Sequence, residues 1–177
     1  MLMTVEKLRT YIETEESDEL LTERLTALEC LIRSYTHNNF QVRSIRSQSA
    51  VRDELILSPP LHIEVGDTVQ ISDSLLNNGL YTVETISEQG MTVTGAGGRL
   101  YDCNKNLVTL VGYPPDLLMG TVNMLKWDMA NRDKVGVQSE TVSRHSVTYF
   151  NMDGDNAVMG YPRSLLGFLK PYMKARF

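Results

Sequence analysis

Apolar side chains return every three or four positions between Leu20 and Tyr35. This is the period of an amphipathic helix, and Ser17, just before it, is a favourable N-cap residue. The pattern predicts a long helix that ends near Asn38, where neighbouring asparagines favour a turn. A shorter apolar repeat over residues 4–11 predicts a first, brief helix.

The pattern changes from about Gln41 to Gly112, where apolar and polar residues alternate in short runs. Such alternation is typical of strands that are buried on one face. Turn signals separate the runs at Gly66-Asp67, at Asn77–Gly79 and at Gln89-Gly90. Several short strands with turns at this spacing favour a small barrel or sandwich.

Helical spacing resumes after Pro114-Pro115-Asp116, because proline is pre-organised for the first turn of a helix. Apolar positions between Leu118 and Met129 then follow at steps of three and four. Residues 137–150 are polar, with an end that favours β structure. Pro162 opens a last helix, which we expect Pro171 to kink or to end.

These patterns together predict an α+β fold. It would be a small helical bundle of about four helices, with a small β-barrel-like or β-sandwich-like domain inserted between the second and third helices. Residues 1–58 would form the N-terminal part of the helical body, residues 59–112 the inserted β domain, and residues 113–177 the C-terminal part of the helical body.

Charge is unevenly distributed along this chain of net charge −5. Residues 1–36 hold eight acids and four bases, residues 37–113 hold eight and five, and residues 114–177 hold six and eight. The acidic excess disfavours a protein whose main role is to grip nucleic acid. The basic C-terminal part suits either an acidic partner surface or the dipole of its own helix.

Targeting signals are not evident in the sequence. The segment Met1–Tyr11 lacks the apolar region of a signal peptide, and no apolar run reaches the roughly 18 residues of a membrane span. We therefore expect neither a signal peptide nor a membrane-spanning segment.

Residues that could carry catalysis or bind a metal form no complete motif. Gly95–Arg99 is glycine-rich but lacks the ending of a phosphate-binding loop. Asp153–Asn156 lacks the glycine and the glutamate that a calcium loop needs. The three histidines and two cysteines are not spaced as metal ligands. We expect no enzyme activity, cofactor or metal, although a carboxylate pair built from distant residues stays open.

Five segments, taken in order, carry a family resemblance: Glu19–Leu21, Ile32–Phe40, Pro114–Leu117, Gly136–Tyr149 and Gly160–Pro162. In this order they resemble the head–tail connector (adaptor) proteins of tailed bacteriophages of the siphophage type. Two departures are a β region that is longer than in the minimal members and the proline that interrupts the last helix. No single motif is specific, so the order carries the resemblance.

The resemblance implies a structural role without catalysis. Connector subunits form a ring, commonly dodecameric, beneath the portal at the capsid vertex. The ring extends the DNA channel and seats the stopper or tail-completion protein. Implied partners are the portal, the stopper and further copies of the chain, with DNA passing through without sequence-specific binding. The implied location is the capsid–tail junction of the virion, and the host cytoplasm during assembly.

The resemblance also implies two sets of site residues. The C-terminal segment would be the tail that docks on the portal, through Leu169, Tyr172, Met173, Lys174, Arg176 and Phe177. A second set would lie at the contact between subunits or in a channel loop, namely Ser139, Glu140, Arg144, His145, Tyr149, Met124 and Trp127.

Two alternatives stay open at this point. One is a tail-completion or stopper protein of the same junction, over which the helix-rich frame favours the adaptor. The other is a peptide-binding module, because Val65–Val69 resembles the opening of many small SH3-like barrels.

Overall fold

The computed structural model describes residues 1–52, 54–58, 62–95, 100–134, 139–142, 145–148 and 156–175. For residues 58, 134, 139–142 and 145–148 it describes the backbone alone.

Two of the helices begin at the N-caps that the sequence indicates. The Thr4 hydroxyl accepts a hydrogen bond from the Lys7 amide, and the Ser17 hydroxyl accepts one from the Leu20 amide. Each cap satisfies a backbone donor that the first turn of a helix leaves free. The helical elements among the described residues are α1 (Val5–Arg9), α2 (Asp18–Thr36), α3 (Pro115–Asn131) and the 3-10 helices η1 (Arg132–Lys134) and η3 (Arg163–Tyr172).

Six strands between α2 and α3 in the chain close into an antiparallel barrel with the order β1-β2-β5-β4-β3-β6. Its interior is a separate apolar cluster that includes Leu55, Val69, Ile71, Met91 and Val108. The strands of the barrel are β1 (Gln41–Val51), β2 (Leu55–Ser58), β3 (Thr68–Ser72), β4 (Gly79–Ile86), β5 (Met91–Thr94) and β6 (Cys103–Val111).

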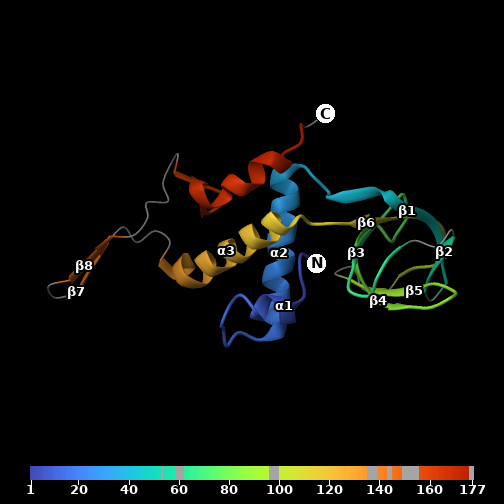
Figure 1. Cartoon of the computed structure of the whole chain (residues 1–177), viewed down its shortest axis with the longest axis horizontal. Helices are drawn as coiled ribbons and strands as arrows, with labels where there is room; N and C mark the ends of the chain where they lie inside the picture. Colours follow the sequence, from blue (N-terminus) through green and yellow to red (C-terminus); the bar gives the residue numbers. More distant parts are fainter. Residues whose placement is uncertain are drawn as a thin grey trace.

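The expected fold class, a helical bundle with an inserted β domain, is wrong. The structure has a closed six-stranded barrel with helices before and after it. In Figure 1, α2 runs across α3 instead of beside it, and the last helical element is a 3-10 helix. The first two barrel strands also come before residue 59, within the range assigned to the helical body. Strand β1 was hard to recognise because the residues it buries include Ser47 and Ser49.

The helices share a second apolar core. Leu8, Leu25, Leu125 and Leu169, from α1, α2, α3 and η3, are each at most 1% exposed. Phe40, at the start of the barrel, also contributes, since its ring lies 5.2 Å from the ring of Tyr113. The chain therefore builds this core from segments that lie on both sides of the barrel.

Four short strands follow α3 in the chain. They form two separate two-stranded sheets. These are β7 (Ser139–Val142) with β8 (His145–Thr148), and β9 (Ala157–Val158) with β10 (Tyr161–Pro162).

Candidate functional site

The hairpin of β7 and β8, here named the arm, stands apart from the helices in Figure 1. Its strands pair from Ser139 with Thr148 to Val142 with His145. Within the described residues, neither strand pairs with any other. Both outer edges are therefore open, and an open edge can accept a further strand. A lone two-stranded hairpin is only marginally stable in water.

A cluster of side chains joins residues that come before the arm in the chain to residues that come after it. Asp128, on α3, is 8% exposed and accepts a hydrogen bond from the Tyr161 hydroxyl at 2.5 Å. Arg132 pairs with the same carboxylate and donates to the Gly160 carbonyl at 3.2 Å. Residues 132 and 160 are thus fastened together, although the arm separates them in sequence.

Aromatic packing reinforces this cluster. The Arg132 guanidinium lies 5.3 Å from the centre of the Trp127 ring and 4.8 Å from that of Tyr161. The two rings are 5.5 Å apart. Burial, followed by the contacts with Asp128, raises the pKa of Tyr161. The hydroxyl therefore keeps its proton and donates a hydrogen bond to the Asp128 carboxylate. We name Trp127, Asp128, Arg132 and Tyr161 the clamp.

The C-terminal segment folds back on the helical core. Leu169 is fully buried, and the Tyr172 hydroxyl donates to Asp116 at the start of α3 at 2.6 Å. The Lys174 amide donates to the Thr36 carbonyl at the end of α2 at 2.8 Å. The segment thus connects the ends of α2 and α3, and its position beside the end of α2 is visible in Figure 1.

The residues expected to bind a portal therefore have different environments. Leu169 belongs to the core of this chain, and Tyr172 is half-buried. Met173 and Lys174 are exposed. Arg176 and Phe177 lie outside the described residues. Of the members that the structure describes, Met173 and Lys174 are the ones open to a partner in this conformation.

The residues expected at a subunit contact or in a channel loop are also divided. Ser139, Glu140 and His145 lie on the strands of the arm. Arg144 and Tyr149 lie outside the described residues. The other two belong to α3: Met124 is fully buried in the helical core, and Trp127 packs in the clamp.

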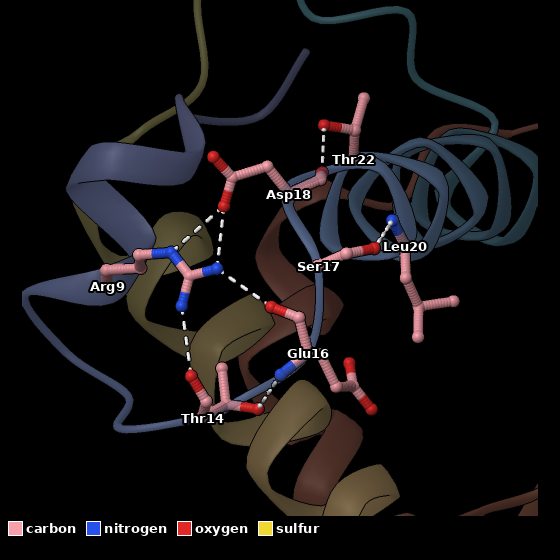
Figure 2. A network of polar contacts seen from close by, with 7 residues as sticks. All are labelled: Arg9, Thr14, Glu16, Ser17, Asp18, Leu20 and Thr22. Carbon is pink, nitrogen blue, oxygen red and sulfur yellow. Dashed lines mark hydrogen bonds and ion pairs between the residues drawn. The ribbon is translucent and has the colours of Figure 1, made fainter.

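The connection between α1 and α2 is fixed by one arginine, as Figure 2 shows. Arg9 donates to the Asp18 carboxylate at 2.6 Å, to the Glu16 carbonyl at 2.8 Å and to the Thr14 carbonyl at 3.0 Å. The Asp18 side chain is largely exposed. The acidic stretch before α2 therefore includes a loop that is ordered by hydrogen bonds, which the sequence pattern did not indicate.

A polar cluster lies where α2 meets the barrel. Glu29, on α2, is 3% exposed and accepts a hydrogen bond from the Tyr113 hydroxyl at 2.6 Å. Arg33, one turn later, donates to Gln70 on β3 at 2.6 Å. Burial and the neighbouring Glu29 raise the pKa of Tyr113. This cluster could not be predicted from the sequence pattern, because its members lie in separate elements.

Next to this cluster, a groove of about 730 Å³ runs between α2 and the strands β3, β4 and β5. Thr22, Thr26 and Cys30 line it from the helix, and Leu80 and Tyr81 line it from the barrel. Two charged groups are in its lining, the Met1 ammonium and the Glu29 carboxylate, and they pair with each other at 3.5 Å.

Chemical sites are not apparent in the part of the chain that the structure describes. Within that part, no three histidine, cysteine or acidic side chains are grouped so that they could hold a metal ion. No helix there is both long enough and apolar enough to cross a membrane. What the described residues do present is a set of surfaces: the arm, the C-terminal segment, the groove and the loops of the barrel.

Comparison with known proteins adds no family. A scan against protein-family models gives no match, and a search of curated proteins gives none either.

Proposed function

We propose that this chain is a structural subunit of the head–tail junction of a tailed bacteriophage, an adaptor that forms a ring beneath the portal. The observation that carries the proposal concerns the arm. The segment Gly136–Tyr149, which holds the longest stretch of family-like sequence, includes both strands of this hairpin. Within the described residues, the arm pairs with no other strand, and residues 132 and 160, which flank it in the chain, are joined by a hydrogen bond.

A ring needs one face of each subunit to fit a different face of the next. An arm with open edges supplies one such face, because a neighbouring copy can add a strand or pack against it. Contact with a neighbour would also remedy the marginal stability of a lone hairpin. The helices and the barrel supply other faces. The proposal gives the chain no catalytic step and no cofactor.

The portal would be contacted by the end of the C-terminal segment. Met173 and Lys174 are exposed there, beside a chain end that carries Arg176 and Phe177. Aromatic and basic residues are frequent among the dominant contacts of protein interfaces. Passing DNA would meet a subunit of net negative charge, which does not favour binding to phosphates.

A stopper or tail-completion protein of the same junction is the second candidate. The fold gives it more weight, because the helical bundle that favoured an adaptor is not present and a closed barrel lies between the helices in the chain. The two roles differ in what the protein binds. An adaptor binds a bare portal ring, whereas a stopper binds a portal that already carries an adaptor.

Electron microscopy of the protein mixed with the portal ring of the same phage tests the proposal. We expect a collar on one face of a bare portal. A collar that forms only after a separate adaptor is added would assign the stopper role, and no collar in either case would refute both.

Two variants locate the contacts in that experiment. Replacing residues 139–148 by a short Gly-Ser linker should abolish the collar while Trp127 fluorescence, which reports the clamp, stays unchanged. Ending the chain after Lys174 should also abolish it. Ending it after Leu166 would be less informative, because the truncation removes the buried Leu169 and damages the core.

A further inference from the structure

The connection between α2 and the barrel is strained. It consists of residues 37–40, and both His37 and Phe40 have a left-handed backbone, each with a φ of 51°. Residues other than glycine rarely adopt this conformation, and they keep it only where their surroundings hold it in place. Among the described residues, two of the four non-glycine residues with positive φ lie in this one connection. The contacts around it therefore have to supply the hold.

The end of the C-terminal segment supplies part of that hold. We name residues 172–174 the strap. The Tyr172 ring lies 5.8 Å from the Phe40 ring, and the Tyr172 carbonyl accepts a hydrogen bond from the Asn38 side chain at 3.2 Å. The Lys174 amide donates to the last carbonyl of α2 at 2.8 Å. The strap thus lies along the connection from the end of the helix to the start of the barrel.

The same contacts reach the second connection, which leads from the barrel to α3. Within the first connection, the Asn38 side chain accepts from the Phe40 amide at 3.0 Å. The Phe40 carbonyl accepts from the amide of Gly112, just after β6, also at 3.0 Å. The Tyr172 hydroxyl bonds to Asp116 in the first turn of α3. The strap therefore fastens both connections between the helices and the barrel.

The strap is held less firmly than the residues before it. Leu169 is fully buried in the helical core, whereas Met173 is 48% exposed and the bond from Tyr172 to Asp116 lies at the surface. An exposed hydrogen bond contributes little net stability, because water replaces the lost partner. The strap can therefore leave the connection while Leu169 keeps η3 in place.

We propose that the strap is a releasable fastening that couples the end of the chain to the orientation of the barrel. The docked strap holds the connection in its strained form. A partner that binds the end of the chain withdraws the strap, the connection relaxes, and the barrel gains further orientations. The bond from Arg33 to Gln70 keeps the barrel attached to α2 meanwhile. The strap does not depend on the proposed function; the identity of the partner, the portal, rests on it.

Hydrogen exchange of the full chain tests the strap without any partner. Tyr172→Ala should make the amides of Phe40 and Gly112 exchange roughly tenfold faster, because both are bonded within the fastened connections. The Val83 amide, bonded inside the barrel, should be unchanged. The control is Tyr11→Ala, which removes a tyrosine that is 38% exposed beyond α1. Exchange at Phe40 and Gly112 as slow as in the control would overturn the strap.

Two glycine variants test the strain, and they do not depend on the folding of Tyr172→Ala. His37→Gly relieves a left-handed position, and the histidine side chain is exposed, so little packing is lost. We expect it to slow exchange at the Phe40 amide. The control is Asn39→Gly, also at an exposed residue but without a positive φ, which should not slow it. Equal exchange in the two variants would overturn stored strain in the connection.

The orientation of the barrel can be measured by the distance between two spin labels. They would be attached at Val65→Cys on the barrel and Ala130→Cys on α3, both exposed, with Cys30 and Cys103 replaced by serine. The labelled chain should give one narrow distance distribution, which Tyr172→Ala should broaden or shift. A distribution that stays as narrow as in the tyrosine control would overturn the coupling to the barrel.

Adding the portal ring to the labelled chain separates this inference from the proposed function. We expect the bound portal to broaden or shift the distribution as Tyr172→Ala does. A collar on the portal with an unchanged distribution would overturn release on binding and leave the adaptor role intact. A distribution that responds to Tyr172→Ala, in a chain that binds no portal, would support the strap and count against the adaptor role.

Discussion

The barrel and the helical body acquire their cores in different ways. Every strand of the barrel comes from the continuous stretch between Gln41 and Val111. The core of the helical body instead joins residues from Leu2 to Leu169. The barrel can therefore close as soon as its own stretch is ordered, whereas the helical body needs both ends of the chain. We expect the helical body to be more sensitive to changes in distant segments.

Leu125→Ala should have the largest effect. Leu125 is fully buried in the helical core, and truncations of this kind cost about 2–5 kcal/mol. Trp127, the single tryptophan, lies in the helical body, so its fluorescence reports the unfolding of that body. In a denaturant titration of Leu125→Ala, the midpoint of the fluorescence transition should move to a much lower denaturant concentration.

The matched change in the barrel is Met91→Ala, also in a core position. If the two cores unfold separately, Met91→Ala should lower the denaturant midpoint of the transition measured by circular dichroism. The midpoint measured by Trp127 fluorescence should stay nearly unchanged. Equal shifts in both midpoints would mean that the two cores unfold as one unit and that the barrel is not stable by itself.

Gly120→Ala should destabilise the contact between α3 and η3. A Cβ atom at Gly120 would lie 2.4 Å from the ring of Phe168. Overpacking of this kind costs about 1–3 kcal/mol. The control is Gly167→Ala on η3, where a Cβ atom would meet nothing within 4 Å. That variant should unfold within about 0.5 kcal/mol of the unaltered chain.

Tyr161→Phe should weaken the clamp by about 1–3 kcal/mol, because it leaves the buried Asp128 with one partner fewer. Hydrogen exchange should increase at the end of α3 and leave the strands of the barrel unchanged. Unchanged exchange at residues 128–132 would show that the Tyr161 hydroxyl does not stabilise the end of α3.

Alkaline pH should weaken the helical body and the junction with the barrel. The pKa values of Tyr113 and Tyr161 are raised above the ordinary 10.0 by burial and by Glu29 or Asp128. Their contribution to stability is complete below pH 10 and is lost as the unfolded chain ionises above it. The melting temperature should therefore fall above pH 10, less so in the double variant Tyr113→Phe with Tyr161→Phe.

Arg9→Ala should have the smallest effect. Its ion pair with Asp18 is largely exposed, and such pairs contribute about 0–1 kcal/mol. Added salt should diminish the difference between variant and unaltered chain. A loss that salt leaves unchanged would show that the carbonyl contacts of Arg9, and not its charge, stabilise the loop.

Local signals in the sequence predicted several elements well. The caps at Thr4 and Ser17 and the start of α3 at Pro114-Pro115 depend on neighbouring residues, so they can be recognised from short stretches. Strand β1 was not separated from the helical body in the expected division, because arginines and serines weaken its alternation. The arrangement of the helices was wrong because packing between distant segments leaves no local pattern.

The candidate surfaces were predicted less well than the elements. The contacts of Asp128 with Tyr161 and of Glu29 with Tyr113 join residues that are far apart in sequence. A lone aspartate or tyrosine gives no indication of its partner. Leu75 and Leu76, which are exposed on the loop between β3 and β4, were likewise not predicted as a surface feature. The exposure of a loop residue depends on what covers the loop and not on the sequence of the loop itself.

The clamp has a mechanical consequence. The arm and the barrel lie at opposite ends of the molecule in Figure 1, and the clamp joins Gly160, which follows the arm in the chain, to the residue after the C-terminal end of α3. Tension on the segments that flank the arm would therefore act on the C-terminal end of α3, whereas the last barrel strand, β6, precedes its N-terminal end in the chain. The stiffness of α3 would then limit how far the clamp can move relative to the barrel.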